Sequence, residues 1–333
     1  MIEVRDLVKD YTVPAPPRRP AFAPPKVKKR ALDSINFTVP KGQVLGLIGP
    51  NGAGKTTTVK VLTGILTPTA GHVRVLGFDP QRDRYRYTYH IGLVFGQRSL
   101  LWYDIPVIES LRLYADIYEI DRAAFDQRVR QFSEMLDIGG LLHIPVRKLS
   151  LGQRMRAEIA ASLLHTPEVL FLDEPTIGLD SVAKERVREF LRQLNRDKGT
   201  TIVLTTHDMN DIEALAQRVL ILDGGRIIYD GAVGPLKELD DHKVIDIQYL
   251  GGPAARKTLL AELQSAGGAV YDGPVDEAVT ATSGRLTLKV PRAAAVEAVA
   301  RLVALGGITD LNVQPPRLDS VIRNVYEKRL AVE

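Results

Sequence analysis

The residue types best suited to chemistry gather at Gly49–Thr56, where three glycines precede a lysine and a threonine. Glycine lets the backbone curl until successive N–H groups point at one centre, where they can hold an anion. Lys55 can reach the outer phosphates of a nucleotide, and the Thr56 hydroxyl can ligate Mg²⁺. A turn that only reverses the chain would require neither side chain, so we expect a phosphate-binding loop. Its predicted contacts are Gly49, Asn51, Gly52, Ala53, Gly54, Lys55, Thr56 and Thr57.

A strand before this loop and a helix after it are expected to hold it in position. The apolar run Val44–Ile48 is typical of a buried strand, and a helix is expected from Thr57 onward. A second apolar strand, Val169–Leu172, ends in Asp173 and Glu174. Asp173 then emerges where a metal ion needs an oxygen ligand, and Glu174 where a water must be polarised for attack on a phosphate. A polar turn at a strand end is the alternative interpretation of this pair.

Other short apolar runs complete an α/β core. Thr201–Thr205 is a further candidate for a parallel sheet, and a helix is expected before it at Val182–Arg196. The core ends in a hairpin formed by Arg218–Leu222 and Arg226–Tyr229, with two glycines in the turn. Upstream, the strands on either side of Lys41-Gly42 are predicted to pair as a β-hairpin that leads into the core.

The N-terminal segment changes character at Pro14. Ile2–Tyr11 is typical of an edge strand, whereas Pro14–Arg30 holds six prolines, six basic residues and no acidic one. Such a composition predicts neither helix nor strand. The segment is either a solvated loop or a basic arm close to anionic lipid headgroups.

The composition limits what the chain can be. Its 333 residues favour one large and one small domain, and 45% hydrophobic with 25% charged residues is ordinary for a soluble protein. No apolar run is long enough to cross a bilayer. The absence of cysteine excludes disulfides and thiolate metal sites. A net charge of +4 is too small to indicate a nucleic-acid partner, and a cytoplasmic location is the default expectation.

After Gly231 the pattern of the sequence changes. Lys243–Leu250 alternates as a strand, and the segments that follow predict the order β-α-β-β-α-β of a small ferredoxin-like α+β domain. No cluster of catalytic residue types occurs in it. A last amphipathic helix is predicted at about Leu318–Leu330.

The motif that narrows the function is Leu149–Gln153, which opens a strongly helical run at Arg154–Leu164. Together with the phosphate loop and the carboxylate pair, it resembles the ATP-binding cassette (ABC) ATPases, whose signature is Leu-Ser-Gly-Gly-Gln. Leu151 stands where that signature has its first glycine, while Ser150 and Gly152 remain. We therefore expect the loop still to bind phosphate.

Further positions agree with this resemblance, which covers Ile2 to about Gly231. They are Gln97 for the family's glutamine loop, Ile177–Asp180 for its aspartate loop and His207 for its switch histidine. The resemblance implies an α/β P-loop NTPase of the ABC-ATPase type, with a β-subdomain, a parallel α/β core and a helical subdomain at about 98–165. The ATPase domain would span 1–238 and carry the Pro-rich, basic insertion 14–30. An accessory or regulatory domain would span 239–333.

The signature lies far from the chain's own phosphate loop, so the resemblance implies two copies that face each other head to tail around two ATP molecules. Ser150, Gly152 and Gln153 would then contact the ATP held by the partner copy. The resemblance assigns the remaining roles as follows: adenine stacking to Tyr11, contact with Mg²⁺ or the attacking water to Gln97, γ-phosphate contact and orientation of Glu174 to His207, and coupling of the two sites to Asp180. The implied catalytic residues are Glu174, His207, Gln97 and Lys55, and the implied Mg²⁺ ligands are Thr56, Gln97 and Asp173.

Three functions remain open for such an ATPase. It can drive an exporter whose permease is a separate polypeptide, drive an importer while its C-terminal domain senses substrate and inhibits it, or act outside transport in translation or DNA repair. The tail at Gln314–Ile322 is similar to the Pro-x-Leu-Glu-x-Val-Phe ending of drug- and polysaccharide-exporter ATPases, which favours export. We expect the permease to dock near Leu101, Trp102 and Tyr103 and to hold the protein peripherally at the cytoplasmic face of the membrane.

Overall fold

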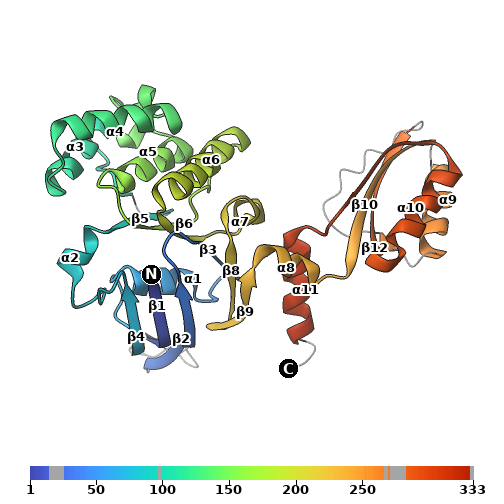
Figure 1. Ribbon diagram of the computed structural model, residues 1–333, viewed down its shortest axis with the longest axis horizontal. Coiled ribbons are helices and arrows are strands. Elements are labelled where there is room, and N and C mark those ends of the chain that lie inside the picture. The colour runs from blue at the N-terminus through green and yellow to red at the C-terminus, as the bar shows by residue number, and fades with distance from the viewer. Residues whose placement is uncertain (15–25, 97–98, 252, 266–268, 271–282, 331–333) are drawn as a thin grey trace, which may run out of the picture. The chain divides into compact units, whose positions relative to one another are not determined.

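The computed structural model describes residues 1–14, 26–96, 99–251, 253–265, 269–270 and 283–330 (Figure 1). Within these ranges the chain forms two compact units, Met1–Val233 and Gly234–Glu333. The phosphate loop and the other predicted site residues that the structure describes belong to the first unit.

A six-stranded sheet forms the centre of the first unit. Its strands are β3 (Val44–Ile48), β5 (Ile91–Phe95), β6 (Val169–Asp173), β7 (Thr201–Thr205), β8 (Arg218–Asp223) and β9 (Arg226–Ala232). They lie in the order β5-β6-β7-β3-β8-β9, and all neighbours are parallel except β8 and β9. The strands β3, β6 and β7 are short, apolar and almost wholly buried, as expected when both faces of a parallel sheet are covered. The predicted parallel core and its terminal hairpin are confirmed.

Three antiparallel strands form a second sheet, the β-subdomain. They are β1 (Ile2–Pro14), β2 (Lys26–Val39) and β4 (Ala70–Val75), in the order β2-β1-β4. The prediction of an edge strand at Ile2–Tyr11 is therefore wrong, because β1 pairs with β2 on one side and β4 on the other. Leu7 and Leu32 of this sheet belong to the same hydrophobic core as Leu45 and Leu47 of β3. The β-subdomain therefore buries its inner face against the strand that leads to the phosphate loop.

The predicted β-hairpin around Lys41-Gly42 is wrong. β2 pairs with β1, whereas β3 pairs with β7 on one side and β8 on the other. A turn does occur here, with Gly42 at a φ of 77°. However, both edges of β3 are used inside the parallel sheet, so neither is left for β2.

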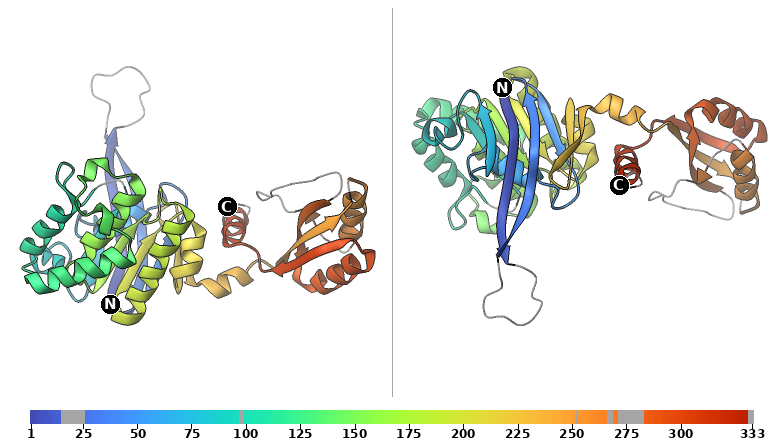
Figure 2. Two further views of the ribbon diagram at one scale, coloured as in Figure 1. Left: turned by 90° about the horizontal axis from the view of Figure 1, so that it is seen from above. Right: turned by 90° about the horizontal axis from the view of Figure 1, so that it is seen from below.

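The prediction that Pro14–Arg30 forms neither helix nor strand is wrong at both ends, for Pro14 and for the last five residues. Lys26–Arg30 begin β2 and pair with Asp10–Pro14, which extends the two strands into an arm (Figure 2). No proline interrupts this part of β2, and Pro14 stands at the end of β1, where a missing N–H costs least. The remainder of the insertion, residues 15–25, lies outside the described residues.

A helical subdomain lies between β5 and β6 in the sequence. It contains α3 (Val107–Ile117), α4 (Arg122–Met135), α5 (Leu151–Leu163) and the short 3-10 helices η1 (Gly139–Leu141) and η2 (Val146–Lys148). Asp121 begins α4 by accepting a hydrogen bond from the Ala124 N–H. The apolar faces of the helices bury Leu111, Phe125 and Phe132. The signature motif thus stands at the start of one of these helices.

The other helices of the first unit return the chain between strands. They are α1 (Lys55–Leu62) after β3, α2 (Arg84–Thr88) before β5, α6 (Ser181–Lys198) after β6 and α7 (Met209–Leu215) after β7. Among the described residues, no helix is both long enough and apolar enough to span a membrane.

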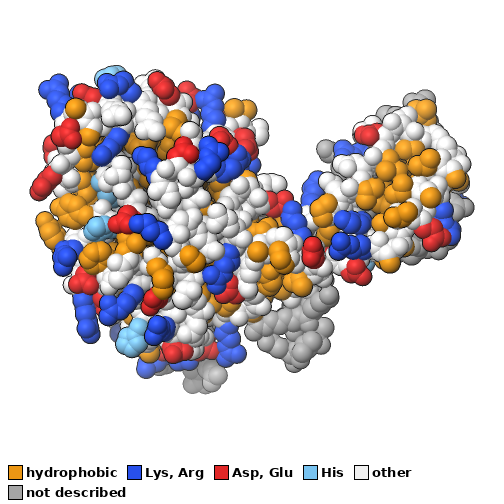
Figure 3. All heavy atoms as spheres, in the orientation of Figure 1, with side chains coloured by type: hydrophobic (Ala, Val, Ile, Leu, Met, Phe, Trp, Pro, Cys, Tyr) orange, Lys and Arg blue, Asp and Glu red, His pale blue; other side chains and the backbone are white. Residues whose placement is uncertain are grey.

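The second unit is a smaller sandwich of helices on a sheet. Its elements are α8 (Val233–Glu238), which begins in the first unit, β10 (His242–Leu250), α9 (Pro253–Ser265), β11 (Ala269–Val270), β12 (Ser283–Pro291), η3 (Arg292–Ala294), α10 (Ala295–Leu305), β13 (Ile308–Gln314) and α11 (Leu318–Leu330). The strand order β11-β12-β10-β13, antiparallel throughout, is that of the predicted ferredoxin-like arrangement. Hydrophobic side chains gather on one face of this unit (Figure 3), and Val296 and Val303 of α10 are exposed.

One carboxylate is buried inside the helical subdomain. Glu158 of α5 is 1% exposed, and its Oε1 lies 3.4 Å from Arg154 Nε, one turn earlier. Burial raises the pKa of Glu158 to about 7, although Ser99 and Arg154 oppose that shift. The folded chain therefore keeps a proton on Glu158 over a pH range in which the unfolded chain has lost it.

We predict that Glu158→Gln flattens the pH dependence of stability, because glutamine stays neutral at every pH. The raised folded-state pKa stabilises the wild type fully below the unfolded value of about 4.5, and this contribution is lost as the pH rises through about 7. Relative to wild type, the variant should gain on the order of 3 kcal/mol between about pH 4 and about pH 8. Urea unfolding of both proteins at the two pH values measures the difference. An equal difference at both values would contradict the prediction.

Candidate functional site

The phosphate loop connects β3 to α1 and is packed tightly against its neighbours. An added Cβ at Gly49 would lie 2.3 Å from the carbonyl oxygen of Leu222, and one at Gly54 would lie 2.6 Å from Leu32 Cδ2. Gly54 also has a φ of 110° where it begins α1. Both positions therefore require glycine, as expected of a loop whose backbone must approach an anion closely.

The loop lines a cavity of about 330 Å³. The residues around it are Asn51, Gly52, Gly54, Lys55, Thr56, Thr57, Lys60, Ile65, Phe95, Gly96, Asp173, Glu174 and Ile177. The fold therefore brings the phosphate loop and the predicted carboxylate pair together, although they lie far apart in the sequence.

Lys55 folds back onto the loop from which it extends. Its Nζ donates hydrogen bonds to the carbonyl oxygens of Gly49 at 2.6 Å and Pro50 at 3.1 Å. Burial lowers the pKa of Lys55, while the nearby charges of Glu174 and Asp173 oppose that shift. The ammonium group is thus held beside the cavity and close to both carboxylates.

Asp173 stands between two hydroxyl groups. Its Oδ1 accepts hydrogen bonds from Thr56 Oγ1 at 3.4 Å and from Thr205 Oγ1, at the end of β7. Hard oxygen donors of this kind are those that Mg²⁺ prefers, and protein sites for Mg²⁺ commonly supply one or two of them and leave the rest to phosphate and water. The described residues contain no group of three acidic, histidine or cysteine side chains that could hold a metal alone. The Thr56–Asp173 pair fits a Mg²⁺ ion that arrives with a nucleotide.

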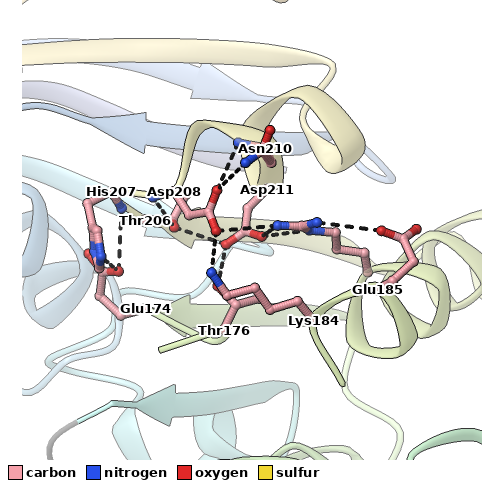
Figure 4. A network of polar contacts seen from close by, with 10 residues as sticks. Glu174, Thr176, Lys184, Glu185, Thr206, His207, Asp208, Asn210 and Asp211 are labelled. Carbon is pink, nitrogen blue, oxygen red and sulfur yellow. Dashed lines mark hydrogen bonds and ion pairs between the residues drawn. The ribbon is translucent and has the colours of Figure 1, made fainter. Parts of the chain in front are cut away.

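Glu174 has an unusual backbone and a close partner. Its φ is 59°, in the left-handed region, and its N–H donates to the carbonyl oxygen of Thr205 at 2.9 Å. The carboxylate Oε2 lies 2.6 Å from His207 Nδ1 and also accepts a hydrogen bond from the His207 N–H at 3.4 Å (Figure 4). A non-glycine residue in this conformation stores strain that often marks functional sites. The predicted Glu174–His207 pair is therefore in direct contact.

Behind this pair lies a buried carboxylate that sequence reasoning missed. Asp211 of α7 is fully buried and accepts hydrogen bonds from Thr176 Oγ1 at 2.5 Å, Thr206 Oγ1 at 3.0 Å and Arg188 Nε at 2.7 Å (Figure 4). Thr176 follows Glu174 by two residues, and Thr206 immediately precedes the switch histidine. Asp211 therefore ties together the segments that carry both groups of the pair.

A second aspartate supports the same corner. Asp208 begins α7 by accepting a hydrogen bond from the Asn210 N–H at 3.0 Å, and it pairs with Lys184 at 2.6 Å and Arg188 at 3.4 Å. Burial opposes its ionisation, yet the hydrogen bonds from Lys184 and Asn210 hold the pKa of Asp208 below its ordinary value. In the sequence, Asp208 and Asp211 stand one helical turn apart directly after the switch histidine. This spacing could have identified both aspartates as functional residues.

Tyr11 lies where the β-subdomain meets the start of α1. Its hydroxyl is 3.4 Å from Thr57 Oγ1, and Lys9 Nζ lies 5.5 Å from the centre of its ring. The aromatic ring predicted to stack on adenine is thus adjacent to the phosphate loop.

The signature residues lie apart from this cavity. Ser150 begins α5 with a capping box, in which its Oγ accepts from the Gln153 N–H at 3.2 Å and its own N–H donates to Gln153 Oε1 at 2.9 Å. Asp180 similarly begins α6 by accepting from the Ala183 N–H at 2.8 Å. In the described part of the chain, the cavity lining includes none of Ser150, Gly152, Gln153 and Asp180. Ser150, Gly152, Gln153 and Asp180, at the starts of α5 and α6, therefore form a group separate from the residues that line the cavity.

Two other predictions have different outcomes. Gln97, predicted to contact Mg²⁺ or the attacking water, lies outside the described residues. Trp102 and Tyr103 are 43% and 58% exposed, but Leu101 is only 4% exposed, so its prediction as a docking residue is wrong. Trp102 packs against the Tyr114 ring, with 5.4 Å between their centres, and this leaves Leu101 on the inner side of the segment.

Comparisons with known proteins agree with this geometry. Residues 32–177 match the family model described as ABC transporter. The chain is 36% identical over 298 residues to the daunorubicin resistance ATP-binding protein DrrA3 of Streptomyces coeruleorubidus, covering 88% of this chain and 90% of the relative. It is 35% identical over 240 residues to a methionine import ATP-binding protein of Rhodopseudomonas palustris, covering 70% of this chain and 64% of the relative.

A solved structure has the same cassette. The fold superimposes on a structure of the ATP-binding subunit of an ABC transporter with a TM-score of 0.62 and 26% identity, covering 72% of this chain and 92% of that one. The family model covers the phosphate loop and the strand-end carboxylate pair, which line one cavity, and His207 contacts Glu174 of that pair. The chain therefore belongs to the ABC transporter family, as an ATP-binding subunit that hydrolyses ATP.

Proposed function

We propose that this subunit dimerises around two ATP molecules and drives export through a separate membrane permease. The observation that carries the proposal is the division of the site residues into two groups. Lys55, Asp173 and Glu174 line one cavity, whereas Ser150 and Gly152 do not. A nucleotide held in the cavity would need a second copy to present that other group to it.

Within one subunit, the loop N–H groups and Lys55 would bind the β- and γ-phosphates. A bound phosphate offers Lys55 a charged acceptor in place of the neutral carbonyl oxygens of Gly49 and Pro50, and charge-assisted hydrogen bonds are the stronger kind. Thr56, Asp173 and Gln97 would hold Mg²⁺, which supplies charge neutralisation when it is bound.

Glu174 would accept a proton from the attacking water. The water oxygen forms a bond to the γ-phosphorus as the bond to the bridging oxygen of ADP breaks, and phosphate leaves. His207 holds Oε2 of Glu174, so Oε1 can face the water. Such in-line transfer depends mainly on positioning and charge, and the contacts of Asp211 with Thr176 and Thr206 help to position the segments that carry both residues.

We expect Glu174→Gln to bind ATP normally but to hydrolyse it at least about 100-fold more slowly, because the amide cannot take up the proton. Lys55→Ala should instead weaken ATP binding itself, since a cation at the phosphates is lost. Nucleotide affinity measured by a fluorescent ATP analogue and turnover measured by phosphate release separate the two effects. Unchanged turnover in Glu174→Gln would remove that residue from its role.

The signature can serve a partner's ATP without losing its role in its own helix. The Ser150 oxygen already accepts a hydrogen bond from Gln153 N–H, but a hydroxyl also has one hydrogen to donate. The start of α5 adds the positive end of a 13-residue helix to the same point. Ser150 and the backbone of Gly152 are thus suited to a γ-phosphate presented from outside.

A mixture of two disabled subunits tests the shared sites. Lys55→Ala and Ser150→Ala should each be nearly inactive alone, because every site in either homodimer carries the defect. In a mixed dimer one site collects both defects and the other is intact, so an equal mixture should recover activity, up to about one quarter of wild-type turnover. Phosphate release measures the recovery. If the subunits coassemble and no activity returns, the shared-site arrangement is rejected.

Two observations support export. The relative that spans almost the whole chain is named for daunorubicin resistance, and the tail carries the exporter-like ending at Gln314–Ile322. Import is the second candidate, because a methionine import protein is also similar and the second unit has a ferredoxin-like strand order. Inhibition of ATP hydrolysis by free methionine would favour import.

The permease would dock on the segment that holds Trp102 and Tyr103, which are exposed aromatic side chains beside the helical subdomain. This contact would keep the subunit at the cytoplasmic face of the membrane.

We predict that Trp102→Ala abolishes export in the native host. Deleting the gene should raise the intracellular level of daunorubicin, the drug for which the similar protein is named; the wild-type chain should restore efflux, and the variant should not. Turnover of the purified variant is measured in parallel. Full efflux with Trp102→Ala would reject this docking site, and an equal loss of turnover would place its effect inside the cassette.

A further inference from the structure

The signature loop and the aspartate loop of the same chain interlock through two leucine-on-glycine contacts. An added Cβ at Gly178 would lie 2.4 Å from Leu151 Cδ2, and one at Gly152 would lie 2.9 Å from Leu179 Cδ2. Each leucine therefore lies directly on the other loop's glycine, at a separation that leaves no room for a methyl group. Gly178 also has a φ of 73°, so its backbone favours glycine independently.

The aspartate loop has little freedom to move away from this contact. Thr176, at its start, is buried and donates a hydrogen bond to the buried Asp211. Asp180, at its end, caps α6. Leu179 between them is buried. A segment anchored at both ends transmits a displacement rather than absorbing it.

The contact also joins two functional groups of residues. Gly178 follows Glu174 by four residues, along the loop that leaves the ATP cavity. Leu151 follows Ser150 directly, at the first position of α5. Leu151 is the residue that departs from the Leu-Ser-Gly-Gly-Gln signature, and a glycine at this position would have no side chain to reach Gly178.

We propose that Leu151 is a positioning residue that clamps the signature to the aspartate loop, so that closure on a partner's ATP is transmitted to Glu174 of the same subunit. The proposal rests on the shared-site dimer of the proposed function. The clamp makes hydrolysis at one site faster when the other site is occupied, because each signature contacts one ATP while its attached loop positions the carboxylate for the second.

A matched pair of variants tests the clamp. Leu151 and Leu113 are 41% and 40% exposed leucines of helices in the same subdomain, and both are changed to alanine. Leu151→Ala should lower the Hill coefficient for ATP hydrolysis from about 2 to about 1 and turnover by roughly tenfold, with ATP binding to dilute subunits unchanged. Leu113→Ala should behave as wild type. Leu151→Met, which conserves volume, should retain cooperativity.

A second variant shows whether the two loops act through contact. Gly178→Ala should reduce turnover both by strain at its φ and by collision with Leu151. Adding Leu151→Ala removes the collision but not the strain, so the double variant should lose less turnover than the two single losses combined predict. Independent, additive losses would overturn the clamp.

The outcomes separate the clamp from the dimer on which it rests. If the wild type is cooperative and Leu151→Ala is equally so, the clamp is wrong and the dimer stands. If the wild type shows no cooperativity and Glu174→Gln shows no ATP-dependent increase in mass by light scattering, both are wrong.

Discussion

Three neighbouring strands, β3, β6 and β7, run parallel and are buried along their lengths, so their carboxyl ends meet at one edge of the sheet. The chain leaves that edge through the phosphate loop, the Asp173-Glu174 pair and the Thr205–His207 segment. Register makes this meeting reliable, because Thr205 pairs with both Leu47 and Asp173. A slip of one residue would turn each side chain to the opposite face, where it would not fit the side chains packed there. Burial of the sheet therefore sets the geometry of the chemistry.

Sequence patterns located this edge because each strand is a short apolar run followed at once by polar residues. Sequence patterns failed where strand pairing or side-chain burial depends on residues far away in the sequence. The turn at Lys41-Gly42 is real, but a local turn does not determine which sheet its strands join. Lys26–Arg30 could pair because the prolines stop before them, a detail that the average composition of the segment concealed. The importance of Asp211 arises from its burial among three donors, and Leu101 differs from Trp102 only in the direction in which each packs.

The polar cluster beside His207 shows how position is maintained without flexible side chains. Asp211 is buried, and its charge is balanced by Arg188 and by two threonine hydroxyls. Removing Arg188 would leave the buried charge of Asp211 without its ion-pair partner, a change that commonly costs about 3–5 kcal/mol. Such a cluster contributes little net stability compared with an apolar core, but its members have few alternative arrangements. It therefore restricts where the segments carrying Glu174 and His207 can lie.

The left-handed backbone of Glu174 makes the folded ATPase domain less stable than it would be with glycine at this position. A residue with a Cβ costs about 1–2 kcal/mol more than glycine in this conformation, and Pro175 restricts the alternatives to which the chain could relax. Glycine at position 174 would thus make the folded state harder to melt while removing the carboxylate that the proposed reaction uses. Laboratory selection for heat resistance alone would favour that replacement, whereas selection for turnover would oppose it.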